Sequence, residues 1–241
     1  MSIEASKKLA AYQAVNEYVL PLLDNKSNNQ PLAIGIGSGS TIVYVIDRLV
    51  EIRDKLIDVK LVPTSFQSKQ LILNNGFTLG SLEEINELEV AIDGADEVDS
   101  NLNAIKGGGA CQLQEKIVAS SSKKFILIAD YRKNSKVLGE NWKQGVPIEV
   151  IPYALNLVTK KITSLGGKPT LRMSGGGKAG PVVTDNGMLV IDADFGLISN
   201  PKELLNQLIH ITGVVEVGLF CDMATVAYFG NQDGTVTKVG N

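Results

Sequence analysis

Short apolar runs alternate with amphipathic stretches over the first 130 residues of the chain. Four apolar runs have the length and composition of buried strands: 32–36, 59–63, 88–94 and 124–130. Four other stretches carry apolar side chains at helical spacing or follow a helix-opening loop: 9–19, 42–49, 65–74 and the segment from KGGGA to about Ser120. Because strands that alternate with helices connect by right-handed crossovers, the pattern predicts a mainly parallel sheet.

The order of predicted elements changes after Lys133. A strand at 146–152, a helix at 153–165, a strand at 169–173 and a hairpin at 181–192 follow one another. Asn186-Gly187 predicts the hairpin turn, and Asn200-Pro201 predicts the start of another helix, ahead of a strand at 214–220. Without the first arm of the hairpin, this order is the β-α-β-β-α-β arrangement of ferredoxin-like domains.

The pattern therefore predicts an α/β protein: a Rossmann-like parallel sheet domain with a smaller inserted ferredoxin-like α+β domain. Two further apolar runs, 224–230 and 234–240, are expected to return to the first sheet. We assign residues 1–140 and 218–241 to the Rossmann-like catalytic domain and residues 141–217 to the ferredoxin-like domain. The polar stretch from Asp24 to Gln30 is expected to end the first helix.

Polar motifs follow four of the predicted parallel strands where each strand ends. They are GSGST at 37–41, TSFQS at 64–68, DGADE at 93–97 and DYRK at 130–133. Ligands of open parallel sheets bind outside the carboxyl ends of the strands, so these motifs are expected to converge on one edge. This convergence argues for a binding site more strongly than any one motif.

Two glycine-rich loops are candidates for holding an anion. In the serine loop, residues 37–41, glycines permit a sharp turn, and the hydroxyls of Ser38, Ser40 and Thr41 add donors beside a helix N-terminus. In the glycine loop, Lys106 to Gly109, backbone N–H groups and a lysine would suit a developing oxyanion. Each loop taken alone also fits a turn without a ligand.

Acidic side chains are the available acid–base groups. The single histidine, His210, is expected to be a packed helical residue, so proton transfer must depend on carboxylates and lysines. Glu115 lies about one and a half turns into the helix after the glycine loop and is the candidate base. Asp93 and Asp96 could bind sugar hydroxyls or move protons between them. A calcium site is the weaker interpretation, because the D-x-D-x-D-G order is missing.

Composition limits the possible functions. The chain has 241 residues, 44% of them hydrophobic, and a net charge of -3, which argues against nucleic-acid binding. It contains no signal peptide and no apolar run long enough for a membrane helix, so we expect a cytoplasmic protein. Cys111 and Cys221 are expected to be reduced thiols. The segment SGGGKAG, residues 174–180, precedes a strand instead of a helix and is expected to be a mobile hairpin loop.

At these motifs the sequence closely resembles ribose-5-phosphate isomerase of type A. The resemblance covers nearly the whole chain, and DGADE together with KGGGA and its downstream glutamate carries it most specifically. It implies interconversion of D-ribose 5-phosphate and D-ribulose 5-phosphate in the non-oxidative pentose phosphate pathway, without metal or organic cofactor, by a homodimer or homotetramer. Ser38 departs from the family, where many relatives have threonine.

The resemblance also implies roles for individual residues. Glu115 is the proton acceptor, and Asp93 and Lys106 assist catalysis. The implied substrate contacts are Ser38, Gly39, Ser40, Thr41, Asp93, Gly94, Ala95, Asp96, Lys106, Gly107, Gly108, Gly109 and Lys133, with Lys7 as a further contact. Two alternatives stay open: a sugar-phosphate sensor module without turnover, and a CoA transferase that uses a glutamate as nucleophile.

Overall fold

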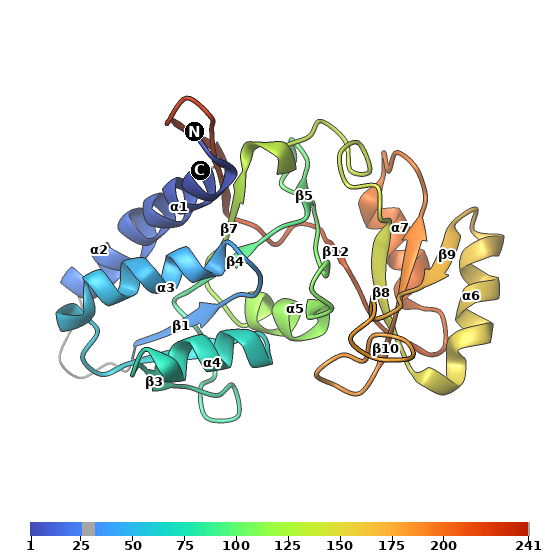
Figure 1. The fold of residues 1–241 in the computed structure, drawn as a ribbon, viewed down its shortest axis with the longest axis horizontal. Coiled ribbons are helices and arrows are strands. Elements are labelled where there is room, and N and C mark those ends of the chain that lie inside the picture. Colours follow the sequence, from blue (N-terminus) through green and yellow to red (C-terminus); the bar gives the residue numbers. More distant parts are fainter. Residues whose placement is uncertain (26–31, 241) are drawn as a thin grey trace. The chain divides into compact units, whose positions relative to one another are not determined.

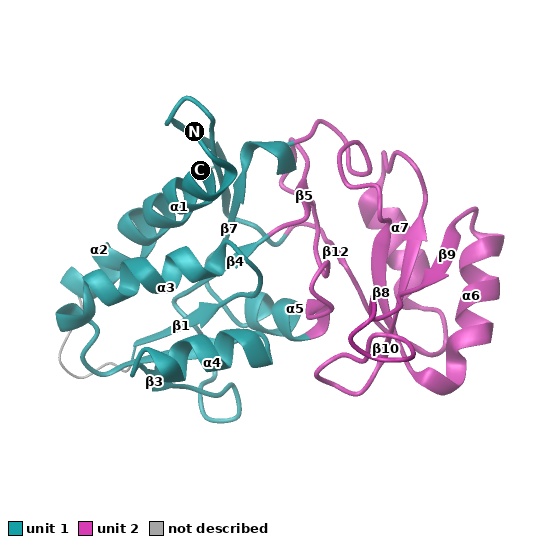
Figure 2. Cartoon of the chain, in the orientation of Figure 1, with its two compact units in different colours: residues 1–94, 114–134, 223–241 teal, residues 95–113, 135–222 magenta. Residues whose placement is uncertain are grey.

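The computed structural model describes residues 1–25 and 32–240, which form two compact units (Figure 2). The first unit comprises residues 1–94, 114–134 and 223–241, and the second comprises residues 95–113 and 135–222. These bounds differ from the predicted domains, because residues 95–113, 135–140 and 218–222 group with the second unit. The predicted domains at 1–140, 141–217 and 218–241 stay a prediction, since compactness alone does not test which segments fold independently.

The first unit contains a seven-stranded sheet with the order β14-β13-β7-β4-β1-β2-β3 (Figure 1). Its strands are β1 (Leu32–Ile36), β2 (Val59–Pro63), β3 (Thr78–Leu79), β4 (Val90–Gly94), β7 (Phe125–Asp130), β13 (Val226–Gly230) and β14 (Val236–Gly240). All neighbours pair in parallel except β13 and β14. The predicted parallel sheet is confirmed, as is the return of the two C-terminal strands.

Helices connect and cover these strands. They are α1 (Ile3–Ala14), a π-helical segment η1 (Val15–Val19), α2 (Leu20–Asp24), α3 (Ile42–Glu51), η2 (Arg53–Lys55), α4 (Phe66–Asn74), α5 (Gln112–Ser120) and η3 (Tyr131–Lys133). The apolar stripe predicted for α3, which includes Ile42, Val45, Ile46 and Leu49, is buried in the core of this unit. Burial of such a stripe is the main stabilising contribution of an amphipathic helix.

The N-terminal helix starts earlier than predicted, and it ends at Asp24, where the predicted polar break begins. It begins at Ile3 instead of Leu9, because Ser2 caps it by accepting the N–H of Ala5 at 3.2 Å. It also continues through η1 into α2, to Asp24. Pro21 lacks a backbone N–H, and the π-helical turns just before it are one way to accommodate the missing bond. The rest of the predicted break, residues 26–30, lies outside the described residues.

The second unit has a four-stranded antiparallel sheet with the order β11-β8-β10-β9. Its elements are β8 (Val146–Val150), η4 (Pro152–Ala154), α6 (Leu155–Ser164), β9 (Lys168–Leu171), β10 (Leu189–Asp194), α7 (Pro201–Ile209) and β11 (Val214–Val217). The chain order and sheet order are those of a ferredoxin-like fold, as predicted. Asn200 caps α7 by accepting the N–H of Glu203 at 3.3 Å.

The first arm of the predicted hairpin is not a continuous strand. Val183 makes only an isolated bridge with Leu189, although Gly187 adopts the positive φ expected of the turn. Thr184 points inward instead, where its Oγ1 donates to Glu149 Oε1 at 2.7 Å. This buried side-chain bond holds the turn together with the backbone bond from the N–H of Thr184 to the carbonyl oxygen of Met188 at 2.9 Å.

A small three-stranded antiparallel sheet, β12-β6-β5, completes the second unit. It consists of β5 (Glu97–Val98), β6 (Ala104–Ile105) and β12 (Leu219–Phe220). Glu97 is buried in this unit, and its carboxylate accepts the N–H groups of Gly139 and Asn141, both at 2.6 Å. These bonds connect the small sheet to the segment that leads into β8.

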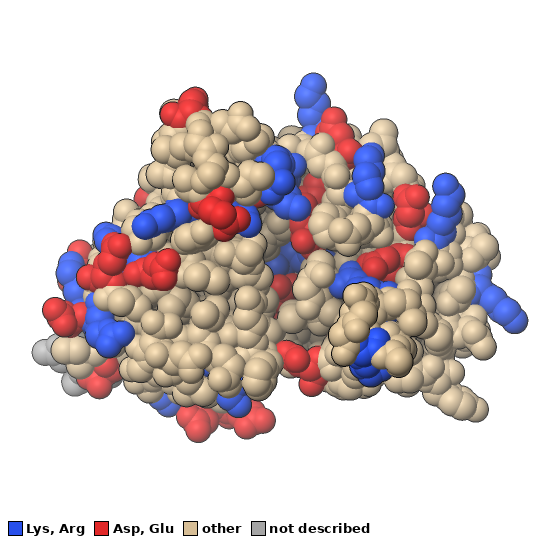
Figure 3. Space-filling view, viewed as in Figure 1, with Lys and Arg blue, Asp and Glu red and all other residues tan. Residues whose placement is uncertain are grey.

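Acidic and basic side chains are interspersed over both units on the face drawn in Figure 3. No extended area of this face carries basic charge alone. Among the residues that the structure describes, no helix has both the length and the apolar character needed to cross a bilayer.

Candidate active site

Asp93, the penultimate residue of β4, holds the serine loop against the end of the sheet. Its Oδ1 accepts the N–H of Ser38 at 2.9 Å and the N–H of Gly94 at 2.7 Å. A Cβ at position 37 would lie 2.0 Å from the same oxygen, so only glycine fits there. The carboxylate is 1% exposed and therefore acts on this loop in a nearly dry environment.

The hydroxyl of Ser38 points into the protein. Its Oγ lies 2.7 Å from Thr64 Oγ1 and 2.6 Å from Ser65 Oγ, within the TSFQS segment. Gln67 of the same segment accepts the N–H of Gly39 at 2.8 Å. Both the hydroxyl and the backbone N–H of Ser38 are thus engaged within the protein. The sequence analysis did not name Gln67 as a residue that contacts the serine loop. Its position in a polar motif at a strand end was the signal that could have identified it.

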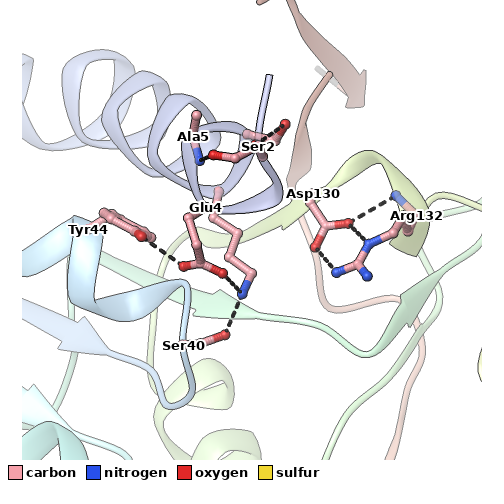
Figure 4. A network of polar contacts seen from close by, with 9 residues as sticks. Ser2, Glu4, Ala5, Ser40, Tyr44, Asp130 and Arg132 are labelled. Carbon is pink, nitrogen blue, oxygen red and sulfur yellow. Dashed lines mark hydrogen bonds and ion pairs between the residues drawn. The ribbon is translucent and has the colours of Figure 1, made fainter. Parts of the chain in front are cut away.

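Lys7 joins the N-terminal helix to the serine loop. Figure 4 shows Glu4, Ser40 and Tyr44, which surround it. Its Nζ donates to Ser40 Oγ at 3.0 Å and to Glu4 Oε1 at 2.7 Å, and Tyr44 donates its hydroxyl to the other oxygen of Glu4 at 2.7 Å. The hydrogen bonds from Lys7 and Tyr44 lower the pKa of Glu4, and the bond to Glu4 raises the pKa of Tyr44. Lys7 thus lies beside Ser40, with Thr41 at the N-cap of α3.

The end of β7 carries a second ion pair (Figure 4). Arg132 donates through Nε to Asp130 Oδ1 at 2.6 Å and through Nη2 to Oδ2 at 3.1 Å. Burial by itself would raise the pKa of Asp130, but the hydrogen bonds and charge of Arg132 outweigh it and hold the pKa below its usual value. Lys133 ends the short η3 segment that follows and is half-buried.

Glu115 lies in the first turn of α5, because that helix begins at Gln112 and not directly after the glycine loop as predicted. One turn further on, Val118 approaches β1 so closely that a Cβ on Gly35 would lie 2.6 Å from Val118 Cγ1. Residues three apart share a helix face, so Glu115 faces the sheet as well. A crossover helix runs opposite to its strands, so Glu115 lies closer than Val118 to their carboxyl ends. Its side chain is buried, at 5% exposed.

In the second unit, Asp96 and the glycine loop are connected directly. Asp96 Oδ2 accepts the N–H of Gly108 at 2.7 Å, and the residue before it, Ala95, begins this unit. Lys106 is only 2% exposed, and its Nζ lies 5.4 Å from the ring centroid of Phe220. Gly108 and Gly109 are exposed, so the loop presents backbone to solvent beside a buried cation.

The structure thus brings the predicted residues together in two groups. Within the first unit, Asp93 contacts Ser38 and Gly94, and Lys7 contacts Ser40. Within the second unit, Asp96 contacts Gly108 of the glycine loop. Their contact with a substrate remains a prediction for every residue in both groups.

The structure also places the remaining residues that the sequence singled out. His210 is exposed, not packed as predicted, because α7 ends at Ile209 and the ring turns back so that Nδ1 lies 2.7 Å from the carbonyl oxygen of Asn206. Cys111 and Cys221 are not joined in a disulfide, and Cys111 Sγ donates to the carbonyl oxygen of Gly109 in the glycine loop at 3.2 Å. Residues 174–180 form a loop closed by a bridge between Met173 and Pro181. Within the described ranges, no group of three or more His, Cys, Asp or Glu side chains is placed to hold a metal ion.

Comparisons with known proteins agree over almost the full chain. The model of the family ribose 5-phosphate isomerase A (phosphoriboisomerase A) matches residues 60–234. The ribose-5-phosphate isomerase of Schizosaccharomyces pombe is 54% identical over 236 residues, which cover 98% of this chain and 83% of that protein. The ribose-5-phosphate isomerase of Dictyostelium discoideum is 52% identical over 238 residues, with 98% and 97% covered.

Solved structures of similar fold are also ribose-5-phosphate isomerases. The ribose 5-phosphate isomerase of Plasmodium falciparum has a TM-score of 0.87 at 32% identity, with 99% of each chain covered. A D-ribose-5-phosphate isomerase in complex with phospho-erythronic acid has a TM-score of 0.89 at 39% identity, with 100% of each chain covered.

Proposed function

Because this chain belongs to the ribose-5-phosphate isomerase A family, we propose that Glu115 is the base with which it interconverts D-ribose 5-phosphate and D-ribulose 5-phosphate. The isomerase activity itself follows from the family. The observation that carries the assignment of the base is the burial of a first-turn glutamate on the sheet-facing side of α5. Most helix glutamates are solvated, and burial of this one favours a chemical role.

The proposed reaction starts from the open-chain aldose. Glu115 removes the proton from C2, and the electron pair moves toward the C1 carbonyl, so that an enediolate forms. Glu115 then returns the proton to C1, while a proton moves from the C2 hydroxyl to the C1 oxygen. The product is the ketose. Asp93 assists this transfer between the oxygens or the opening of the sugar ring.

Lys106 and the backbone of the glycine loop stabilise the negative oxygen of the enediolate. A cation and fixed N–H groups in a dry environment stabilise such charge more strongly than water does. The 2% exposure of Lys106 supports this role, since the charge is screened little by solvent. Because the N–H of Gly108 already donates to Asp96, that amide can serve the substrate only if Asp96 releases or shares it.

The substrate phosphate is proposed to bind at the serine loop with Lys7, and Lys133 is a further contact. The hydrogen bond between Lys7 and Ser40 supports a shared ligand, because one phosphate oxygen could accept from both groups. The start of α3 adds backbone N–H groups and the positive end of the helix dipole. Gly94, Ala95 and Asp96 are proposed to contact the sugar.

Further expectations from the family resemblance remain proposals. The enzyme is expected to use no metal or organic cofactor, to bind neither nucleic acid nor membranes, and to act in the cytoplasm within the pentose phosphate pathway. It is expected to form a homodimer or homotetramer. Exposed apolar side chains at Ile151, Tyr153 and Leu157 of the second unit support self-association. No observation favours a sensor module or a CoA transferase.

The deciding experiment replaces Glu115 by glutamine, which keeps the shape of the side chain and removes its basicity. Turnover of ribose 5-phosphate should fall by ~10²–10⁴-fold while binding of a non-reacting sugar phosphate persists. Glu203→Gln is a matched control, since Glu203 also lies in the first turn of a helix but is exposed. Glu115→Gln activity within about threefold of wild type would refute the assignment.

A further inference from the structure

Arg172 contacts the glycine loop from a part of the chain that lies outside every predicted site motif. It follows β9 directly, and its Nη1 donates to the carbonyl oxygen of Gly107 at 2.8 Å and to that of Gly108 at 3.1 Å. All three residues belong to the second unit. A single guanidinium nitrogen therefore holds two consecutive peptide groups of the loop.

Asp192 of β10 fixes the guanidinium itself. Nε of Arg172 donates to Asp192 Oδ2 at 2.8 Å, and Nη2 donates to Asp192 Oδ1. Both side chains are 14% exposed. The planar guanidinium of arginine can make both contacts at once, because Nε and Nη2 pair with the carboxylate while Nη1 reaches the loop.

Holding the two carbonyls determines where two N–H groups point. In a trans peptide, the C=O of one residue and the N–H of the next point in opposite directions. The bond to Gly107 O therefore directs the N–H of Gly108 away from Arg172, toward Asp96, which accepts it at 2.7 Å. The bond to Gly108 O orients the N–H of Gly109 in the same way.

This orientation matters because the loop has little rigidity of its own. Glycine has no side chain to restrict the backbone, and Gly107 occupies the positive-φ region at +99°. A hydrogen bond from a cation to a carbonyl also polarises the peptide, which makes the following N–H a stronger donor.

We infer that Arg172, held by Asp192, is a positioning residue of the isomerase: it fixes the backbone of the glycine loop, with the N–H of Gly108 directed at Asp96 and the N–H of Gly109 directed at the substrate. This inference rests on the proposed function, since it requires that the loop serve the reaction. Arg172 acts through Gly107 and Gly108 and is not assigned any contact with the sugar or the phosphate.

The test compares Arg172→Ala, Arg172→Lys and Asp192→Asn with Arg53→Ala. Arg53 is a matched control, because its Nη2 donates to the carbonyl oxygen of Asn75 at 2.8 Å in the first unit. Arg172→Ala should lower kcat/KM by ~10–100-fold, mainly through kcat, and added guanidinium should restore part of it. Arg172→Lys should stay impaired, since an ammonium cannot span the carboxylate and both carbonyls. Asp192→Asn should be intermediate.

Amide exchange at Gly108 and Gly109 supplies a readout that a purely structural role would not move. Exchange should quicken at these two amides in Arg172→Lys while the melting temperature stays near that of wild type. If Arg172→Ala fails to fold, Arg172→Lys decides alone. A folded Arg172→Lys variant with the kcat of wild type would overturn the inference, because it would show that any positive charge at this position is enough.

Gly108→Ala separates this inference from the proposed function. A Cβ at position 108 would lie 2.5 Å from Asp96 Oδ1, so this change disturbs the loop directly. Loss of activity in Gly108→Ala with full activity in Arg172→Ala would reject only the role of Arg172. Full activity in Gly108→Ala would reject the role of the loop, and the inference with it. In the double variant Arg172→Ala/Gly108→Ala, losses of activity smaller than the sum of the two single losses would support action of Arg172 through the loop.

Discussion

Asp93 Oδ1 accepts the backbone N–H of Ser38 at 2.9 Å, although 55 positions separate the two residues in the chain. β1 and β4 are neighbours in the sheet, so the loop that follows one strand meets the carboxylate at the end of the other. This bond brings a serine loop and an acidic motif, each ambiguous alone, into direct contact. It also makes Asp93 a structural support of the loop as well as a proposed proton carrier.

The close approach of Gly37 to Asp93 gives a prediction about stability and activity. Gly37→Ala would place a methyl group 2.0 Å from Asp93 Oδ1, so the loop must move. We expect a loss of ~1–3 kcal/mol in the free energy of unfolding, together with a large loss of turnover. Urea unfolding and an isomerase assay measure both. Gly177→Ala is the control, because a Cβ there meets nothing within 4 Å. Equal effects of the two changes would contradict this account.

Lys7 should contribute to phosphate affinity. Removal of a charge-assisted hydrogen bond is expected to cost ~1.5–3 kcal/mol, so Lys7→Ala should raise KM for ribose 5-phosphate by ~10–100-fold with a smaller change in kcat. Lys8→Ala provides the comparison, since Lys8 is exposed and lies 4.9 Å from the ring centroid of Tyr12. An unchanged KM in Lys7→Ala would remove Lys7 from the proposed phosphate site.

Asp130 should make stability depend on pH in the acid range. Because its pKa is lowered in the folded protein, its ion pair stabilises the fold above the ordinary pKa of about 4. That contribution is lost as the pH falls through the lowered value. Asp130→Asn should therefore destabilise the protein at neutral pH, and the difference from wild type should shrink as the pH falls below about 4. Denaturant unfolding at several pH values measures this.

Asp54→Asn is the control for Asp130, because Asp54 is exposed on η2. It should leave stability within about 0.5 kcal/mol of wild type at every pH. A gap between wild type and Asp130→Asn that stays constant from neutral to acid pH would show that the charge of Asp130 contributes nothing.

Activity should not depend on a divalent metal. A lysine and backbone N–H groups are proposed to stabilise the enediolate, so dialysis against a chelator should leave kcat unchanged. Assays after chelation, with and without added Mg²⁺, decide the matter. Activity that vanishes and then returns with Mg²⁺ would replace the role proposed for Lys106 with one for the metal.

The pattern of apolar residues determined most of the fold. β1 and β2 begin and end where their apolar runs do, and α7 begins at the proline that follows Asn200. These features are local, since strand burial, helix periodicity and capping depend on neighbouring residues in the chain. The order β-α-β-β-α-β likewise limited the second unit to few topologies, and the antiparallel sheet follows one of them.

Long-range contacts decided what the chain pattern could not. Three hydrogen bonds join residues far apart in sequence: Ser38 to Ser65, Gly39 to Gln67, and Arg172 to Gly107 of the glycine loop. The order of residues along the chain was enough to predict which residue types are available for the chemistry and which strand ends carry them. It could not predict which of their donors point outward, because the direction of a hydrogen bond depends on the partner that folding brings within reach.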